Sequence, residues 1–272
     1  MDRKVYIRSL SQISRSNPDP DYRSMFSVME ARRLSLLMKR AIAVSKQALA
    51  EAGVAVPDAV ITGTGLGCID NTERFLKSLT GLSDAPLRPT NFMQSTHNTI
   101  GSLIAITLGC HGYNATYSHG AISFESALFD AFLQIGAGEI ENALVGAFEE
   151  MTPDFAAMLA KIGWDGVTRP EDLSETAVSL LLTASPEDAL CRIDDIVISN
   201  NPAEGPAFDD RTKVIDRASC VAAYGDNFCV SAHGLCDAVR ALAAGGCGRA
   251  AVVNSFSGKY RATITLSSLC GE

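Results

Sequence analysis

Long apolar runs are absent from this sequence of 272 residues. No stretch approaches the about 20 consecutive apolar residues that a membrane helix needs, so we expect no membrane span. The chain starts with Met1-Asp2-Arg3-Lys4 and then alternates like a strand, which is not the pattern of an export signal. These absences together predict a soluble, cytoplasmic protein.

Blocks of like charge are also missing. The net charge is −8, and the charged residues, 20% of the chain, are scattered along it. An acidic chain without a basic stripe argues against a nucleic-acid-binding surface. Hydrophobic residues make up 47% of the sequence, which is enough for a large core in one large domain or in two closely packed halves.

The eight cysteines include no C-x-x-C pair. Without an export signal we expect free thiols that pack as small apolar groups, and we expect no metal and no cofactor. Cys229, His233 and Cys236 lie four and three residues apart, a spacing that can place metal ligands on one face of a helix. Because no fourth ligand is evident, chance packing is the favoured interpretation. Nothing nearby supports Cys229 and His233 as a nucleophile and its base.

The first part of the chain alternates between strand and helix patterns. Ser27 and Glu30 form a capping box that predicts a single helix as far as Gly53, and Asn71 is predicted to cap a helix over residues 73–79. This alternation predicts a mixed or parallel sheet with helices on both faces. Further strands are predicted over Val5–Ile13, Ala59–Gly63, Tyr113–Ser118, Ala143–Gly146 and Thr176–Thr183, further helices over Ile100–Leu108, Ile122–Ile135 and Phe155–Ile162, and loops over Ser14–Asp21 and Pro86–Thr96.

A smaller set of elements follows the polar stretch Ser185–Asp188, which we take as the boundary between residues 1–187 and residues 188–272. Ile193–Ser199 is predicted as a strand and Ser231–Ala244 as a helix. A polar loop is predicted over Asn200–Asp216. The last two strands, Arg249–Phe256 and Tyr260–Ser267, flank Gly258 and are expected to pair as a hairpin.

Several segments resemble β-ketoacyl synthases, members of the thiolase-like condensing enzymes. They occur in the family's order: Pro89–Gly101, Leu108–Thr116, Ala121–Ala131, Asn142–Glu150 and, near the end, Val253–Gly258. The likeness covers about Val5–Ser185, whereas almost nothing between Asp188 and Ala232 matches. The resemblance implies a thiolase-like layered α-β-α fold with a shortened second half. The chain is most similar to the short ketosynthase-like proteins of aryl-polyene and flexirubin-type pigment synthesis.

A condensing enzyme needs a cysteine thiolate at a helix N-terminus, where the helix dipole lowers the thiol pKa. The family pattern puts a serine two residues and an alanine six residues after that cysteine, and Ser123 and Ala127 fill these positions. The nucleophile position then falls on Ala121, which cannot form a thioester. No cysteine lies between Cys110 and Cys191, so a small shift of the alignment does not supply one.

The remaining family chemistry is also incomplete. The second half should contribute two histidines, but it contains only His233, so the predicted site is a degenerate one around Ser118, His119, Ala121, Ser123 and His233. A shifted register would offer Ser118 as nucleophile with His119 as its base. Neighbours on a strand point to opposite faces, which argues against that pair.

Loss of the cysteine suggests a silent subunit, similar to the chain length factors that pair with an active ketosynthase in fatty acid or polyketide synthesis of the aryl-polyene type. The expected partners are that ketosynthase, in a heterodimer, and an acyl carrier protein. An active β-ketoacyl synthase of altered mechanism and a homodimeric acyl-binding scaffold are the alternatives. The residues expected at the acyl tunnel or partner interface are Phe92, Met93, His97, Tyr113, Thr116 and Phe256, with core packing as the alternative for Phe92 and Met93.

Three further features receive structural interpretations. The turn Gly63-Thr64-Gly65-Leu66-Gly67 lacks the spacing of a dinucleotide fingerprint, so its glycines are expected to serve close packing. Glu149 and Glu150 are expected to cap the helix that begins near Thr152 and Pro153. His97 and His111 are interpreted as hydrogen-bonded loop residues.

Overall fold

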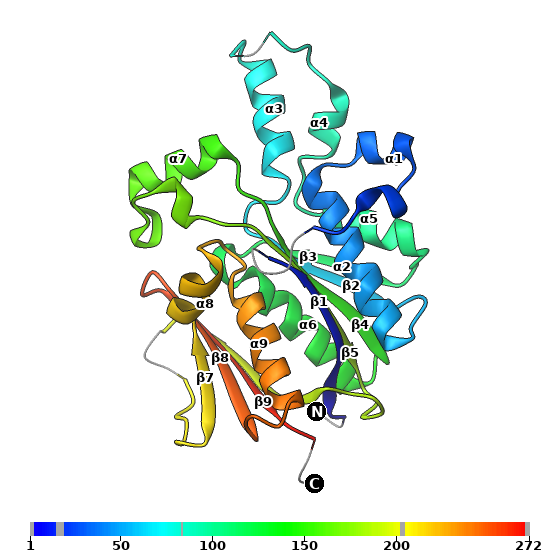
Figure 1. The fold of residues 1–272 in the computed structure, drawn as a ribbon, viewed down its shortest axis with the longest axis vertical. Helices are drawn as coiled ribbons and strands as arrows, with labels where there is room; N and C mark the ends of the chain where they lie inside the picture. The colour runs from blue at the N-terminus through cyan, green and yellow to red at the C-terminus, as the bar shows by residue number, and fades with distance from the viewer. Residues whose placement is uncertain (1–2, 15–18, 83, 202–204, 270–272) are drawn as a thin grey trace.

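The computed structural model describes residues 3–14, 19–82, 84–201 and 205–269. Within these ranges the strands form one mixed nine-stranded sheet in the order β3-β2-β4-β5-β1-β6-β9-β8-β7 (Figure 1). The strands are β1 (Val5–Ile13), β2 (Ala59–Gly63), β3 (Tyr113–Tyr117), β4 (Asn142–Glu149), β5 (Thr176–Thr183), β6 (Cys191–Ser199), β7 (Thr212–Asp216), β8 (Arg249–Phe256) and β9 (Tyr260–Ser267).

The sheet consists of two runs of strands with the same internal order. In the first run β2 is parallel to β4, β4 is antiparallel to β5, and β5 is antiparallel to β1. In the second run β7, β8, β9 and β6 repeat these relations in the same order. The counterpart of β3 is missing from the described second run. The two runs meet where β1 pairs with β6 over only three residues, Val5–Ile7. The predicted shortened second half is therefore a duplicate with one strand fewer.

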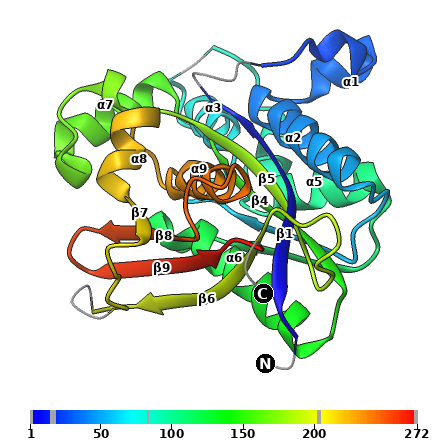
Figure 2. The same cartoon turned by 60° about the horizontal axis from the view of Figure 1, so that its bottom comes forward.

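The helices divide into layers on the two faces of the first run (Figures 1 and 2). The apolar faces of α2 and α5 pack on one face of β1, β2, β4 and β5. On the other face, α6 and α9 share one large core with strands of both runs. The helices are α1 (Val28–Arg33), α2 (Leu36–Ala52), α3 (Ile69–Leu79), α4 (Pro89–Met93), α5 (Thr99–Leu108), α6 (Ser123–Ala137), α7 (Pro153–Ile162), α8 (Arg217–Tyr224) and α9 (Ser231–Ala243).

Several predicted boundaries were wrong. The helix that begins after the Ser27–Glu30 capping box ends at Arg33, because Leu34 has an extended backbone and Ser35 caps the new helix α2. Asn71 is a buried residue inside α3 and does not cap it. Part of the predicted loop over Pro86–Thr96 forms α4.

The polar appearance of Asn200–Asp216 hid a strand. Thr212–Asp216 forms β7, which pairs in parallel with β8 at the edge of the sheet. Its polar, half-exposed side chains reflect that edge position.

The predicted hairpin of β8 and β9 is confirmed, with Gly258 at φ 62° in the turn. Residues 15–18 and 202–204 of the two predicted loops, and Cys270, lie outside the described residues.

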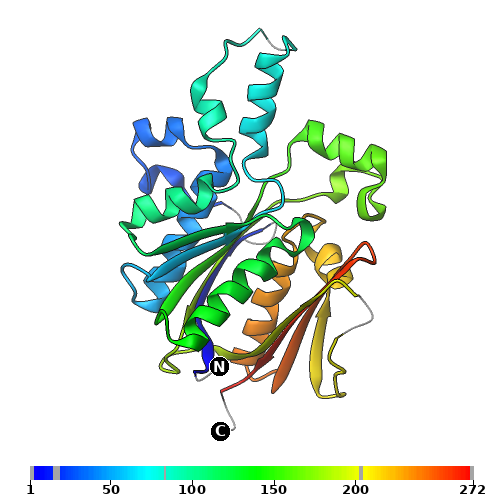
Figure 3. The same cartoon turned by 180° about the vertical axis from the view of Figure 1, so that it is seen from behind.

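The hairpin of α3 and α4 projects from the body of the molecule (Figures 1 and 3). Its exposed apolar side chains are Leu76, Leu79, Leu82, Leu87, Phe92 and Met93. Across the described ranges, every helix is too short or too polar to cross a bilayer.

Candidate functional site

Ala121 occupies a rigid turn at the N-terminal end of α6. The turn is a short 3-10 helix, Gly120–Ile122, that runs directly into α6. The Ser123 hydroxyl fixes this turn, because it accepts a hydrogen bond from the His119 N–H at 2.9 Å and donates one to the Gly120 carbonyl at 2.6 Å. Ala121 itself is 3% exposed. Ala121, which the sequence pattern predicts at the family's nucleophile position, is therefore buried at a helix N-terminus and carries a methyl group.

The second half reaches this turn through Asn254, near the end of β8. The Asn254 side-chain amide donates to the Ala121 carbonyl at 2.7 Å and to Glu125 Oε1 at 2.8 Å. Glu125 is fully buried, and burial raises the pKa of its carboxyl group. The two halves thus meet at the N-terminus of α6, where the structure brings together Ala121, Ser123 and a segment, Val253–Gly258, that the sequence also singled out.

Arg217, at the start of α8, brings a buried cation to this site, and no pattern in the sequence indicated it. Its guanidinium pairs with Asp226 at 2.5 Å and with Asp165 at 3.1 Å. It also donates to Asn254 Oδ1 at 3.3 Å and lies 5.1 Å from the centre of the Phe256 ring. Burial raises the pKa of Asp226 to about 6, which outweighs the opposing attraction of Arg217.

Cys229 lies further along the same buried network. Its backbone N–H donates to Asn227 Oδ1 at 2.8 Å, and its Sγ is 3.7 Å from Glu149 Oε2. Burial and the Glu149 carboxylate raise the pKa of Cys229 well above its usual value. The thiol therefore stays protonated at neutral pH and is a poor nucleophile.

Four further buried cysteines are also poor sources of a thiolate. Burial is the main cause that raises the pKa values of Cys68, Cys191, Cys220 and Cys236 to about 12. All the described cysteines are free thiols, as the sequence predicted.

The histidines do not assemble around Ala121. The Gln12 side-chain amide lies 3.1 Å from His233 Nδ1, and the His233 ring stacks on Tyr224 with centroids 4.5 Å apart. Burial lowers the pKa of His233 to about 4, so the ring is neutral. His119 turns its Nδ1 to Ser126 Oγ at 3.0 Å and not to Ser118.

The described residues contain no cluster of three His, Cys, Asp or Glu that would hold a metal, and Cys229 and His233 contact different partners.

The residues expected at the tunnel or partner interface lie in three different settings. Phe92 and Met93 are 58% and 71% exposed on the projecting hairpin, which excludes core packing within this chain. Tyr113 lies on the open edge strand β3, where it is also exposed. By contrast, the Thr116 hydroxyl points inward and lies 2.9 Å from that of Thr62.

His97 and Phe256 both contact other parts of the chain. His97 is exposed and packs against Gly67, whose φ of 65° and close neighbour both favour glycine. Phe256 packs against Trp164, with ring centroids 5.5 Å apart. Whether these residues border a tunnel or a partner remains a prediction.

The glycine turn and the two glutamates form one structural unit. An added Cβ at Gly63 or Gly65 would overlap the backbone of α6 or the side chain of Phe228, which confirms the close-packing interpretation. The expected role of the glutamates as caps of α7 was wrong, because Thr152 caps that helix. Glu149 instead accepts the N–H groups of Gly65 and Leu66 at 2.6 and 2.9 Å.

The second glutamate supports the projecting hairpin. Glu150 accepts the Asp70 N–H at 3.1 Å, in the first turn of α3. Burial raises the pKa of Glu149 to about 8 and that of Glu150 to about 7. Both carboxyl groups therefore hold the loop that leads into α3.

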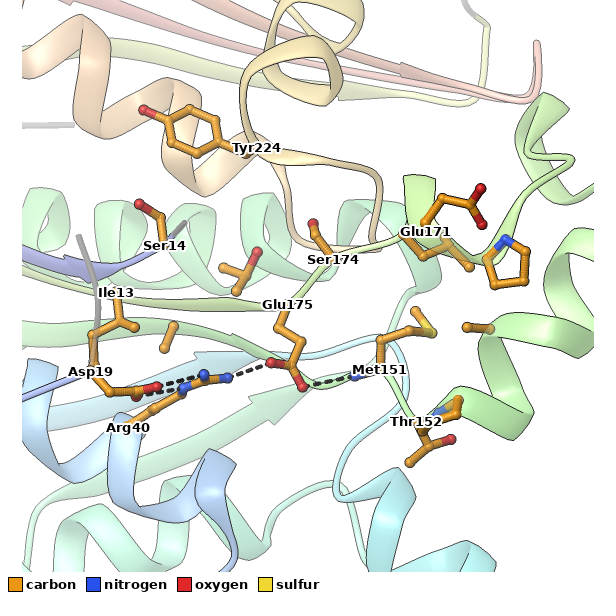
Figure 4. Close-up of a pocket in the computed structure, with 16 residues that line it drawn as sticks. Ile13, Ser14, Asp19, Arg40, Met151, Thr152, Glu171, Ser174, Glu175 and Tyr224 are labelled. Atoms are coloured by element: carbon orange, nitrogen blue, oxygen red, sulfur yellow. Dashed lines mark hydrogen bonds and ion pairs between the residues drawn. The ribbon is translucent and has the colours of Figure 1, made fainter. Parts of the chain in front are cut away.

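A cavity of about 710 Å³ lies beside the network, with Ser174 and Thr176 in its lining (Figure 4). The same two side chains hydrogen-bond Asn227, so they form a wall between the cavity and the network. Arg40 lies in the cavity wall between Asp19, at 2.7 Å, and Glu175, at 2.5 Å. A wall with fixed charges is unsuited to a hydrocarbon chain.

Two strand runs around a shared helix layer, with a helix N-terminus where the halves meet, define a thiolase-like condensing-enzyme fold. The chain belongs to the β-ketoacyl synthase family, because the model of the "Beta-ketoacyl synthase, N-terminal domain" matches residues 8–229. This match confirms the resemblance identified in the sequence. No curated protein matches the chain in sequence.

Solved structures share the fold at low identity. A type II polyketide synthase acyl carrier protein in complex with its ketosynthase (AntDE:AntF) has a TM-score of 0.81 at 14% identity, covering 98% of this chain and 100% of that one. The ishigamide ketosynthase/chain length factor has a TM-score of 0.76 at 14% identity, with the same coverage. The ketosynthase ApeO with its chain length factor ApeC from Xenorhabdus doucetiae has a TM-score of 0.61 at 19% identity, covering 98% and 97%.

Proposed function

We propose that this chain is a non-condensing ketosynthase-like subunit that acts as a chain length factor. It pairs with an active β-ketoacyl synthase in fatty acid or polyketide elongation of the aryl-polyene type. The observation that carries this proposal is the buried methyl group of Ala121 at the N-terminus of α6. The protonated, buried thiols of Cys229 and Cys236 argue against an active synthase of altered mechanism. The fold shared with ketosynthase and chain length factor complexes supports the pairing.

The edge strand β3 is a suitable surface for that pairing. It is hydrogen-bonded to β2 on one side and ends the sheet on the other, so its outer backbone groups are free to pair with another chain. Two exposed apolar side chains lie near this edge: Tyr113 on β3 itself, which is 44% exposed, and Ile106 on the adjoining helix α5, which is 77% exposed. An interface here would bury both side chains.

The projecting hairpin is the second proposed contact. The hairpin exposes several apolar side chains together: its leucines, Phe92 and Met93. An ordinary surface exposes such side chains singly, so this grouping favours a position covered by a partner. The Phe92 ring is held by Phe75, with centroids 5.2 Å apart, so it has a defined place on the hairpin. We propose that Phe92 and Met93 border the acyl tunnel of the partner and limit its length.

A groove of about 580 Å³ beside this hairpin suits an acyl carrier protein. Its lining includes Arg32, Arg33, Arg74 and Arg88 together with Asp70, Glu150 and Glu175, so basic side chains outnumber acidic ones by one in a chain of net charge −8. Complementary charge accelerates and orients the docking of an acidic partner. We propose that the carrier that delivers acyl groups to the complex contacts this groove.

The pairing is tested by co-expression with candidate ketosynthases, followed by co-purification and product analysis. We expect a stable heterodimer whose products depend on both chains. A chain that stays a homodimer or monomer in the presence of every candidate ketosynthase would instead establish a scaffold or acyl-binding module.

In that complex, Phe92→Ala is expected to shift the products towards longer chains without abolishing synthesis, because removal of the ring lengthens the proposed tunnel. Leu82→Ala is the matched control, since Leu82 is 80% exposed on the same hairpin and belongs to no predicted tunnel wall. The measurement is the chain-length distribution of released products by mass spectrometry. Identical distributions for Phe92→Ala and the unmodified complex would remove Phe92 from the tunnel.

A further inference from the structure

The segment Gly163–Gly166, which follows α7, is a strained tongue on the surface of the molecule. Gly163, Asp165 and Gly166 all have left-handed backbones, with φ of 65°, 48° and 82°. Glycine adopts this conformation readily, whereas an aspartate is less stable in it. Something in the surrounding structure must therefore hold Asp165 in place.

Two contacts with the second half hold the tongue. The Trp164 ring lies in a slot between Phe228 and Phe256, with centroid distances of 4.6 and 5.5 Å. The Asp165 carboxylate accepts a hydrogen bond from Arg217 Nε at 3.1 Å, and its side chain is only 21% exposed. The core beneath α7 and the tongue is a small satellite cluster, separate from the two main cores. The local packing that resists opening is therefore modest.

The same contacts connect the tongue to the buried site. Asp165 binds Arg217, Arg217 donates to Asn254, and Asn254 donates to the Ala121 carbonyl. With the tongue in place, Trp164 covers one side of the Phe256 ring and Asp165 binds one edge of the Arg217 guanidinium. Withdrawal of the tongue would uncover the Phe256 ring and the Arg217 guanidinium, which is linked to Ala121 through Asn254.

We propose that Gly163–Gly166 is a latch over the degenerate site, held shut by the Trp164 slot and the Asp165–Arg217 ion pair. Release of the left-handed strain at Asp165 favours the open state, and the two contacts favour the closed one. The latch controls whether molecules from solvent reach the surroundings of Ala121. This inference does not depend on the proposed function, because it concerns the isolated chain.

The first test is hydrogen exchange in the full chain with Asp165→Asn, which removes the charge but suits a left-handed backbone. The Gly166 and Val167 N–H groups bond the Gly163 and Trp164 carbonyls at 3.2 and 2.8 Å, so they report on the tongue. We expect their exchange to become about tenfold faster, because a charge-assisted hydrogen bond is lost. Trp164 is the single tryptophan of the chain, so quenching of its fluorescence by acrylamide should rise in parallel.

Asp172→Asn is the matched control, because Asp172 pairs with exposed Arg169 at 2.5 Å a few residues away. It should leave exchange at Gly166 and Val167 unchanged. Equal acceleration in both variants would mean general loosening of the segment and would overturn the latch. Trp164→Leu, which empties the aromatic slot, should open the tongue independently of charge, and unchanged exchange in both Asp165→Asn and Trp164→Leu would also overturn it.

A second readout tests access to the site itself. Ala121→Cys places a thiol at the buried position, and its alkylation by iodoacetamide is followed by peptide mass spectrometry. We expect slow labelling in the single variant and about tenfold faster labelling when Asp165→Asn is added. Equal labelling rates would show that the tongue does not control access.

Discussion

Replacement of Arg217 with methionine is expected to lower the free energy of unfolding by about 3–5 kcal/mol, because it removes one partner of a buried ion pair. The side chains of Arg217 and Asp226 are 7% and 4% exposed, so the remaining carboxylate would be left in the interior without its cation. Asp165 and Asn254 would each lose a bond to the guanidinium as well. The measurement is urea denaturation of the purified chain, followed by circular dichroism.

Two further variants separate this effect from a general loss of charge. Arg169→Met breaks the exposed pair with Asp172 and should cost no more than about 1 kcal/mol. The double variant Arg217→Met/Asp226→Leu should recover much of the loss, since it removes the stranded carboxylate together with the cation. A loss of less than about 1 kcal/mol for Arg217→Met would contradict the described network.

Stability is expected to fall as the pH rises from 6.5 to 8. Burial raises the pKa of Glu149 to about 8 and of Glu150 to about 7, above the ordinary value of 4.5 that applies to the unfolded chain. The folded state therefore holds these protons more tightly, and deprotonation between pH 6.5 and 8 destabilises it. For each proton that the folded chain binds and the unfolded chain has released, the free energy of unfolding falls by about 1.4 kcal/mol per pH unit. Over this window we therefore expect the free energy of unfolding to fall by about 2–3 kcal/mol.

The buried His233 contributes little in this window, and with the opposite sign. Its pKa is lowered to about 4, so it destabilises the fold mainly as the pH falls below its ordinary value of 6.5. Glu149→Gln should remove most of the slope between pH 6.5 and 8, whatever its effect on absolute stability. Glu51→Gln, at an exposed position on α2, should leave the slope unchanged. If the free energy of unfolding of the unmodified chain did not change between pH 6.5 and 8, Glu149 would be ionised in the folded state at no cost in stability.

The elements with strong apolar periodicity were predictable from the sequence, and those defined by tertiary contacts were not. β1, β5 and α6 appear within two residues of the expected bounds, because buried faces impose a clear pattern. The edge strand β7 carries mostly polar side chains and pairs only with β8, so nothing local distinguishes it from a loop. The break at Leu34 was hidden because Ser35 caps α2 within a continuous apolar pattern.

The same division holds at the site. Ala121 and Ser123 could be predicted because the family resemblance fixes their spacing, and the structure places both at the N-terminal end of α6. Arg217, Asp226 and Asp165 were missed, because they come from three separate segments that only the fold brings together. Of the residues in this network, Asn254 alone could have been singled out from the sequence, because it lies in the family-like segment Val253–Gly258.

We expect that Ala121 leaves this chain unable to hold an acyl group covalently. The most direct measurement is intact-protein mass spectrometry of the reconstituted pair of ketosynthase and this chain after incubation with an acyl carrier thioester. We expect an acyl adduct on the ketosynthase and none on this chain. An adduct on any serine or cysteine of this chain, mapped by peptide analysis, would contradict it.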